Sequence, residues 1–135
     1  GEDWPLDYDE LEPFYGLAEV ELGVAGDSAI DDGSPRSTPY PLPPHPQSYL
    51  DTVVAPVAAG LGIGVEPTPQ ARNSARYQNR PECCGNGSCI PVCPIGAKYD
   101  GAVHVARAEA RGARVLENSV VFALDRGAGE RISQA

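Results

Sequence analysis

All four cysteines of this chain lie between positions 83 and 93, in the run CCGNGSCIPVCP. They are Cys83, Cys84, Cys89 and Cys93, and Pro94 follows the last of them. A disulfide framework usually spreads its cysteines along a chain so that they connect distant loops. Thiolates gathered on one loop rich in glycine and proline can instead converge on one soft metal centre. The spacing therefore predicts a metal cluster.

The end of this run favours iron and sulfur over zinc. Three residues separate Cys89 from Cys93 and a proline follows, which is the form that ends the cysteine runs of bacterial ferredoxins. Structural zinc sites more often use two separated Cys-x-x-Cys pairs, which this sequence lacks. Zinc, a loop disulfide and reduced free thiols are the alternative interpretations.

Neighbouring residues of an extended segment point to opposite sides, so we expect Cys83 and Cys84 not to bind the same cluster together. Three ligands then remain, either Cys83, Cys89 and Cys93 or Cys84, Cys89 and Cys93. A set of three suits a 3Fe-4S cluster better than a cubane that needs four ligands. The fourth thiol is expected to pack as a small buried hydrophobe.

The composition is unusual for a self-sufficient domain. The 135 residues include 14 Pro and 15 Gly, which predicts long ordered loops. They include no Met, so we expect a chain that is either processed or, as we favour, cut from a longer protein. The net charge of −9 repels phosphate backbones, so no nucleic acid partner is expected. No apolar stretch approaches the roughly 18 residues that span a bilayer, so no direct membrane insertion is expected.

The elements that must position the cysteines are helices and irregular segments. An N-cap at Asp7 and apolar residues at helical spacing predict a helix that ends at Gly23. Ser48 predicts the start of a second helix over 49–61, and the proline-rich residues 24–47 between them form a long ordered loop or an exposed linker. A third helix is predicted over 96–110, and β-branched residues predict a short strand pair or one bent strand over 113–124. From Arg126 onward no element is expected.

No catalytic motif accompanies these elements. His45 and His104 lie in no metal-binding or nucleophile pattern and are interpreted as structural or solvated. The glycines at 60, 62 and 64 follow a helix, which is the wrong context for a dinucleotide-binding turn. The acidic residues near the N-terminus form a solvated cap region: Asp3, Asp7, Asp9 and Glu10.

Four segments together resemble a known family. They are DWPLDYDELEPFY, PYPLPPHP, PTPQARNS and CCGNGSCIPVCPIGAKYDGAVHVARAEARGARVLENSVV. They resemble the middle of a bacterial flavoprotein of the glucose-methanol-choline (GMC) oxidoreductase superfamily, in the branch of gluconate 2-dehydrogenase and FAD-dependent glucose and fructose dehydrogenases. The cysteine block is the most specific part, because generic members of the superfamily lack it.

The resemblance implies an α+β segment of a two-domain flavoprotein, with a Rossmann-type FAD-binding domain and a substrate domain. Residues 1–82 would lie next to the substrate domain, 83–100 would form the cluster loop, and 101–135 would return to the FAD domain. Matched residue by residue, the 3Fe-4S ligands fall on Cys83, Cys89 and Cys93. A backbone contact to the FAD adenine falls on Val121, for which sheet core is the simpler interpretation.

The implied activity is oxidation of a CH–OH group in a sugar, polyol or sugar acid. Electrons would pass from FAD through the cluster to cytochrome c or to a quinone-linked subunit. The family's phosphate-binding glycine turn and catalytic histidine have no counterpart here, so these would come from the remainder of the polypeptide. The alternative is a small non-catalytic iron-sulfur or zinc-binding electron-transfer domain.

Overall fold

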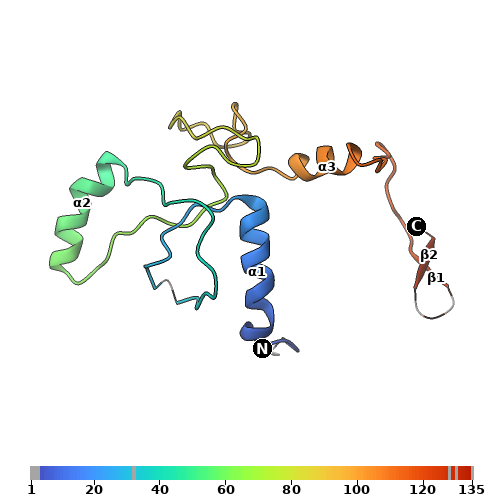
Figure 1. The fold of residues 1–135 in the computed structure, drawn as a ribbon, viewed down its shortest axis with the longest axis horizontal. Coiled ribbons are helices and arrows are strands. Elements are labelled where there is room, and N and C mark those ends of the chain that lie inside the picture. Colours follow the sequence, from blue (N-terminus) through green and yellow to red (C-terminus); the bar gives the residue numbers. More distant parts are fainter. Residues whose placement is uncertain (1–3, 32, 128, 130, 135) are drawn as a thin grey trace. The chain divides into compact units, whose positions relative to one another are not determined.

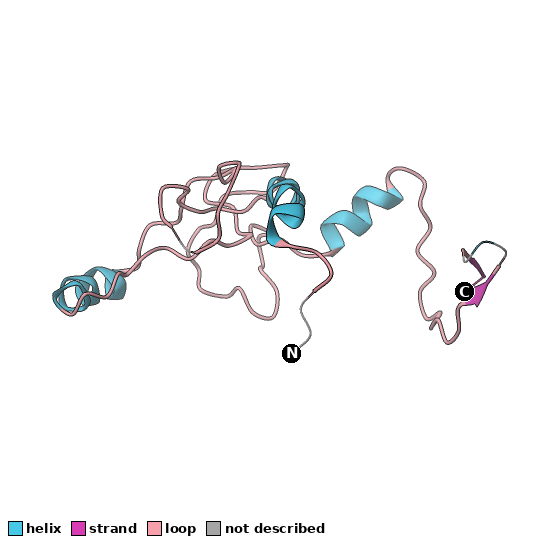
Figure 2. Ribbon diagram, turned by 90° about the horizontal axis from the view of Figure 1, so that it is seen from below, coloured by secondary structure: helices cyan, strands magenta, loops and turns pink. Residues whose placement is uncertain are grey.

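The computed structural model describes residues 4–31, 33–127, 129 and 131–134. They form two compact units, Gly1–Asp100 and Gly101–Ala135. The first unit contains helices α1 (Tyr8–Leu22) and α2 (Tyr49–Gly60), and the second contains α3 (Ala102–Glu109), β1 (Asp125–Arg126) and β2 (Ile132–Gln134) (Figure 1). Loops connect these elements and make up much of the chain (Figure 2). The expected mixture of helices and loops is observed, together with a short strand pair that lies later in the sequence than expected. No described helix has both the length and the apolar character to cross a membrane.

Both helices of the first unit begin with the predicted capping residues. The Asp7 carboxylate accepts a hydrogen bond from the Glu10 N–H at 2.9 Å, and the Glu10 carboxylate accepts one from the Asp7 N–H at 3.2 Å. Ser48 and Asp51 make the same reciprocal pair at the start of α2. Such a capping box satisfies N–H groups that have no partner within the helix. The two helices were therefore predicted correctly, with ends within a residue of those observed.

The core of the first unit is small. Among the described residues, the buried apolar side chains are Val24, Ala25, Leu42 and Ala97. The Ala25 N–H donates to the Gln70 carbonyl at 2.9 Å, and the neighbouring Gly26 N–H donates to the Leu42 carbonyl at 3.1 Å. Three loop segments thus meet around Ala25 through isolated bridges rather than through a sheet.

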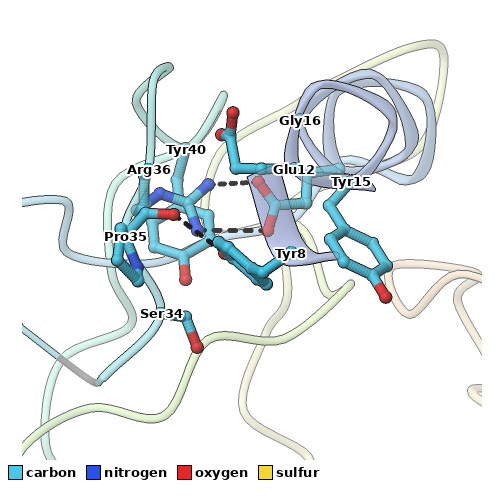
Figure 3. A pocket seen from close by; sticks show the side chains of 9 residues that line it. Tyr8, Glu12, Tyr15, Gly16, Ser34, Pro35, Arg36 and Tyr40 are labelled. Carbon is cyan, nitrogen blue, oxygen red and sulfur yellow. Dashed lines mark hydrogen bonds and ion pairs between the residues drawn. The ribbon is translucent and has the colours of Figure 1, made fainter. Parts of the chain in front are cut away.

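The proline-rich segment 24–47 is an ordered loop held against α1, not an exposed linker. Arg36 forms an ion pair with Glu19 of α1, and its guanidinium carbon lies 3.5 Å from the centre of the Tyr40 ring (Figure 3). The Ser37 N–H donates to Glu12 at 2.8 Å, and this hydrogen bond lowers the pKa of the Glu12 carboxyl. The loop and α1 enclose a cavity of about 200 Å³ that is lined by none of the cysteines.

The expected start of the third helix, at residue 96, is wrong. Residues 96–101 belong to the loop, and α3 begins only at Ala102. Gly96 has a left-handed φ of +69°, and the Tyr99 N–H donates to the Ala71 carbonyl at 2.7 Å. These contacts draw the chain away from helical geometry, because the backbone groups already have partners across the loop.

The expected strands over 113–124 are also wrong, and so is the expectation of no element after Arg126. Residues 113–124 form no hydrogen-bonded strand, whereas β1 and β2 pair antiparallel around a turn in which the Gly127 N–H donates to the Arg131 carbonyl at 2.8 Å. A strand propensity reflects packing against neighbouring strands more than the backbone itself. Phe122, 98% exposed, shows that this segment has no such neighbour in the described part of its unit.

Gly23, the residue that caps the C-terminus of α1, is predicted to be sensitive to substitution. Its φ is +73°, and a Cβ there would lie 2.7 Å from Arg80 Nη2 and 2.8 Å from a Tyr77 ring carbon. Gly23→Ala is therefore expected to lower stability by about 1–2 kcal/mol through backbone strain and by about 1–3 kcal/mol more through overpacking. Thermal unfolding of the full-length protein measures this loss.

Gly33→Ala is the matched control. Gly33 has a φ of +83° but no atom within 4 Å of an added Cβ, so it should cost only the strain of about 1–2 kcal/mol. Equal decreases in melting temperature for the two variants would contradict the close packing at Gly23.

Candidate functional site

The cysteine loop, residues 83–100, belongs to the first unit. All four thiols are free. Cys83, Cys89 and Cys93 are half-buried, whereas Cys84 is exposed. Cys84 thus differs from the other three cysteines in its exposure. The expectation that the fourth thiol is buried is wrong for Cys84, because the few buried apolar residues of this unit leave its side chain exposed.

The two ends of the cysteine loop are joined at one place, the segment 71–73. The Cys83 N–H donates to the Asn73 carbonyl at 2.9 Å, and the Asn73 N–H donates to the Ala97 carbonyl at 3.0 Å. Arg72 and Lys98 form an antiparallel bridge beside these bonds. The first and last residues of the cysteine loop are therefore held close together, and all four cysteines lie on the loop between them.

Cys93 lies at a turn in which the Gly96 N–H donates to the Cys93 carbonyl at 3.1 Å. The Lys98 N–H makes the largest contribution to a lowered pKa of the Cys93 thiol, and the N–H groups of Ile95, Ala97 and Gly96 add to it, while desolvation opposes them. A lowered pKa favours the thiolate, which is the form that binds metals. Clustered backbone N–H groups of this kind occur around many iron-sulfur sites.

The other loop cysteines have simpler surroundings. The Cys83 sulfur accepts a hydrogen bond from the Gly85 N–H at 3.4 Å, and the Lys98 ammonium donates to the Cys89 carbonyl at 3.4 Å. Cys89 also lines a cavity of about 280 Å³ together with Ile90 and Tyr99. Gly85 has a positive φ of +71°, which lets the chain turn directly after the cysteine pair.

The donor set fits a cluster better than a single metal ion. Among the described residues, no three side chains of Cys, His, Asp or Glu gather closely enough to hold one ion. A cluster divides its thiolate ligands among several metal atoms, so they stand further apart than the ligands of zinc. Three half-buried thiols on one loop, with N–H donors at one sulfur, are the soft ligands that such a group requires.

The other residues singled out in the sequence belong to a loop, to α1, to α3 and to an irregular segment. His45 Nε2 lies 2.9 Å from the Arg72 carbonyl oxygen, and His104 is half-buried on α3. Asp7 and Glu10 cap α1, as expected, and Asp3 lies outside the described residues. Val121 is 61% exposed in an irregular segment, so the simpler interpretation of it as sheet core is wrong.

Sequence reasoning missed Asn73 and Arg80, which are the buried polar residues of the described chain. Their hydrogen bonds connect the ends of the cysteine loop with the end of α1. The only signal was the dense polar string RNSARYQNR directly before the cysteines, in a chain where basic residues are scarce.

No family model matches the sequence, but known proteins do. The chain is 44% identical to the fructose dehydrogenase large subunit of Gluconobacter japonicus over 98% of its own length. It is 34% identical to paromamine 6'-oxidase of Streptomyces fradiae over 72% of its length, and 29% identical to the gluconate 2-dehydrogenase flavoprotein of Pantoea cypripedii over 58%. It spans 25%, 17% and 15% of these relatives, respectively.

These similarities agree with the resemblance carried by the sequence motifs, and the fructose dehydrogenase alignment includes the cysteine loop. Over the segment that it spans, this chain belongs to the GMC oxidoreductase superfamily.

Proposed function

We propose that this chain is the electron-transfer segment of an FAD-dependent dehydrogenase that oxidises a CH–OH group of a sugar, polyol or sugar acid. The observation that carries the proposal is the loop of three half-buried thiols, Cys83, Cys89 and Cys93, closed at its base and supplied with N–H donors at Cys93. The similarity to a fructose dehydrogenase large subunit supports the substrate class.

Cys83, Cys89 and Cys93 would hold a 3Fe-4S cluster. When bound, such a group supplies one-electron steps between a flavin, which accepts two electrons at once, and a one-electron acceptor. The protein's own contribution is to keep three sulfurs on one loop and to stabilise the Cys93 thiolate with main-chain N–H groups. Cys84, which is exposed, would not be a ligand.

The FAD-binding and catalytic parts would come from the remainder of the polypeptide. In this proposal residues 1–82 adjoin the substrate domain and 101–135 return to a Rossmann-type FAD domain, where the Val121 backbone contacts the adenine. The exposed apolar side chains of the second unit support this, because Val120, Val121 and Phe122 need a partner surface.

The electron acceptor would be cytochrome c or a quinone-linked subunit. One relative is named a large subunit, which supports an assembly with partner chains. The alternative of a small non-catalytic iron-sulfur or zinc domain has less support, because the matches are to dehydrogenases and oxidases several times longer than this chain.

The full-length protein, purified without air, is expected to contain about three iron atoms per chain, because three thiolates lack the fourth ligand of a cubane. Iron analysis and electron paramagnetic resonance (EPR) measure this. Cys83→Ser should abolish the EPR signal, and Cys84→Ser, its matched neighbour, should leave the signal nearly unchanged. A wild-type enzyme without iron would contradict the proposed function. The reverse pattern of the two variants would show that Cys84 is the ligand.

A further inference from the structure

Two polar side chains are buried beneath the cysteine loop, and the proposed function does not use them. Asn73 is fully buried and Arg80 is 6% exposed. Burying an amide or a cation is unfavourable unless hydrogen bonds replace those lost to water. The partners of these two residues therefore show what their burial achieves.

Asn73 contacts both ends of the cysteine loop. Its carbonyl accepts the Cys83 N–H at 2.9 Å, and its N–H donates to the Ala97 carbonyl at 3.0 Å. Its side-chain amide donates to the Tyr77 carbonyl at 3.1 Å and to the Arg80 carbonyl at 3.0 Å. Asn73 thus fixes the turn 73–80 and the base of the loop with one set of hydrogen bonds.

Arg80 connects the same place with helix α1. Its Nη1 donates to the Ala97 carbonyl at 3.3 Å, and its Nη2 donates to the Leu22 carbonyl at the end of the helix. α1 has no basic residue in its last turn, so Arg80 provides the cation that a helix C-terminus favours. The rigid helix end therefore anchors the guanidinium at the base of the loop.

Ala97 links Arg80 to the segment that carries Cys93. Its carbonyl oxygen accepts hydrogen bonds from the Asn73 N–H and from Arg80 Nη1. The preceding residue, Gly96, donates its N–H to the Cys93 carbonyl at 3.1 Å. Asn73 and Arg80 therefore hold the segment that directly follows Cys93 at the base of the loop.

We propose that Asn73 and Arg80 are positioning residues for the cysteine ligands. They hold the Cys83 N–H and the Ala97 carbonyl together at the base of the loop, so that the three thiols are presented as one set. The inference rests on the proposed iron-sulfur site. Positive charge near a cluster favours its reduced form, so the Arg80 guanidinium also raises the reduction potential.

The test uses the full-length enzyme with its flavin, purified without air. Arg80→Gln removes the cation. Arg80→Lys keeps the positive charge, but a single ammonium cannot replace the two guanidinium nitrogens that bind the two carbonyls. Arg76→Gln is the control, because Arg76 is an exposed arginine four positions earlier in the sequence. For each variant, flavin content, iron content and an EPR-monitored redox titration are measured. Arg80→Gln is expected to lose most of its iron while keeping its flavin, and any remaining cluster should have a lower potential. Arg80→Lys should lie between it and the wild type, and Arg76→Gln should match the wild type.

The proposal stands if at least one Arg80 variant that keeps its flavin has less iron or a lower potential than Arg76→Gln. It is overturned if both Arg80 variants match the control, or if both lose flavin and iron together, since Arg80 would then support the fold in general. Iron missing from the wild type itself would overturn the proposed function and this inference with it. The wild-type iron analysis therefore distinguishes the two failures.

Discussion

A Cys89→Ser enzyme is expected to reduce its flavin with substrate at a nearly normal rate and yet deliver electrons to its natural acceptor far more slowly. Hydride transfer needs the flavin and a catalytic base, and both lie outside this chain in the proposed enzyme. Onward delivery of single electrons needs the cluster held by Cys83, Cys89 and Cys93. Loss of one ligand should therefore separate two reactions that are coupled in the wild type.

Stopped-flow absorbance measures flavin bleaching after mixing with a sugar substrate, and a cytochrome or quinone assay measures delivery. Cys84→Ser is the matched control, because this thiol lies in the same loop but is exposed. It should behave as the wild type in both assays. The idea fails if Cys89→Ser binds flavin normally and passes electrons to its acceptor at the unmodified rate.

The isolated 135-residue chain is expected to unfold without a sharp cooperative transition. Its buried apolar core in the described residues consists of Val24, Ala25, Leu42 and Ala97, which is very little for a chain of this length. One side of α2 exposes large apolar residues that would adjoin other parts of a longer protein: Leu50, Val53, Val54 and Val57. Such a surface is typical of a segment that is stabilised by contacts beyond itself.

Circular dichroism during heating, in the far and near ultraviolet, measures this. The full-length protein is the control and should show a cooperative transition under the same conditions. A steep, reversible transition of the isolated monomer without metal would contradict the prediction.

Local signals predicted the helices well. The pairs Asp7 with Glu10 and Ser48 with Asp51 each act within one turn, so their residues are close in the sequence and in space alike. Gly23 ended α1 as predicted, because its left-handed backbone is accessible to glycine at little cost. The cysteine loop was likewise visible as a run of adjacent residues.

Interactions between distant residues could not be predicted in this way. The side chains of Tyr77 and Gln78 donate to the Val20 carbonyl of α1, which is more than fifty residues away in the sequence. No local sequence pattern predicts such a pairing. The apolar string around Val121 has strand propensity, but propensity becomes a strand only beside a partner strand. The ligand roles of the cysteines stay a prediction, supported by exposure and by backbone donors rather than by an observed cluster.

The donors at Cys93 belong to the main chain, and this has an evolutionary consequence. A substitution at positions 95–98 changes a side chain but keeps the backbone N–H group, so most point mutations there retain the N–H groups that lower the pKa of Cys93. Only proline removes a backbone donor outright. The exposed side chain of Ile95 can therefore vary among related sequences without loss of these donors, whereas proline at positions 95–98 is the exchange that selection should reject.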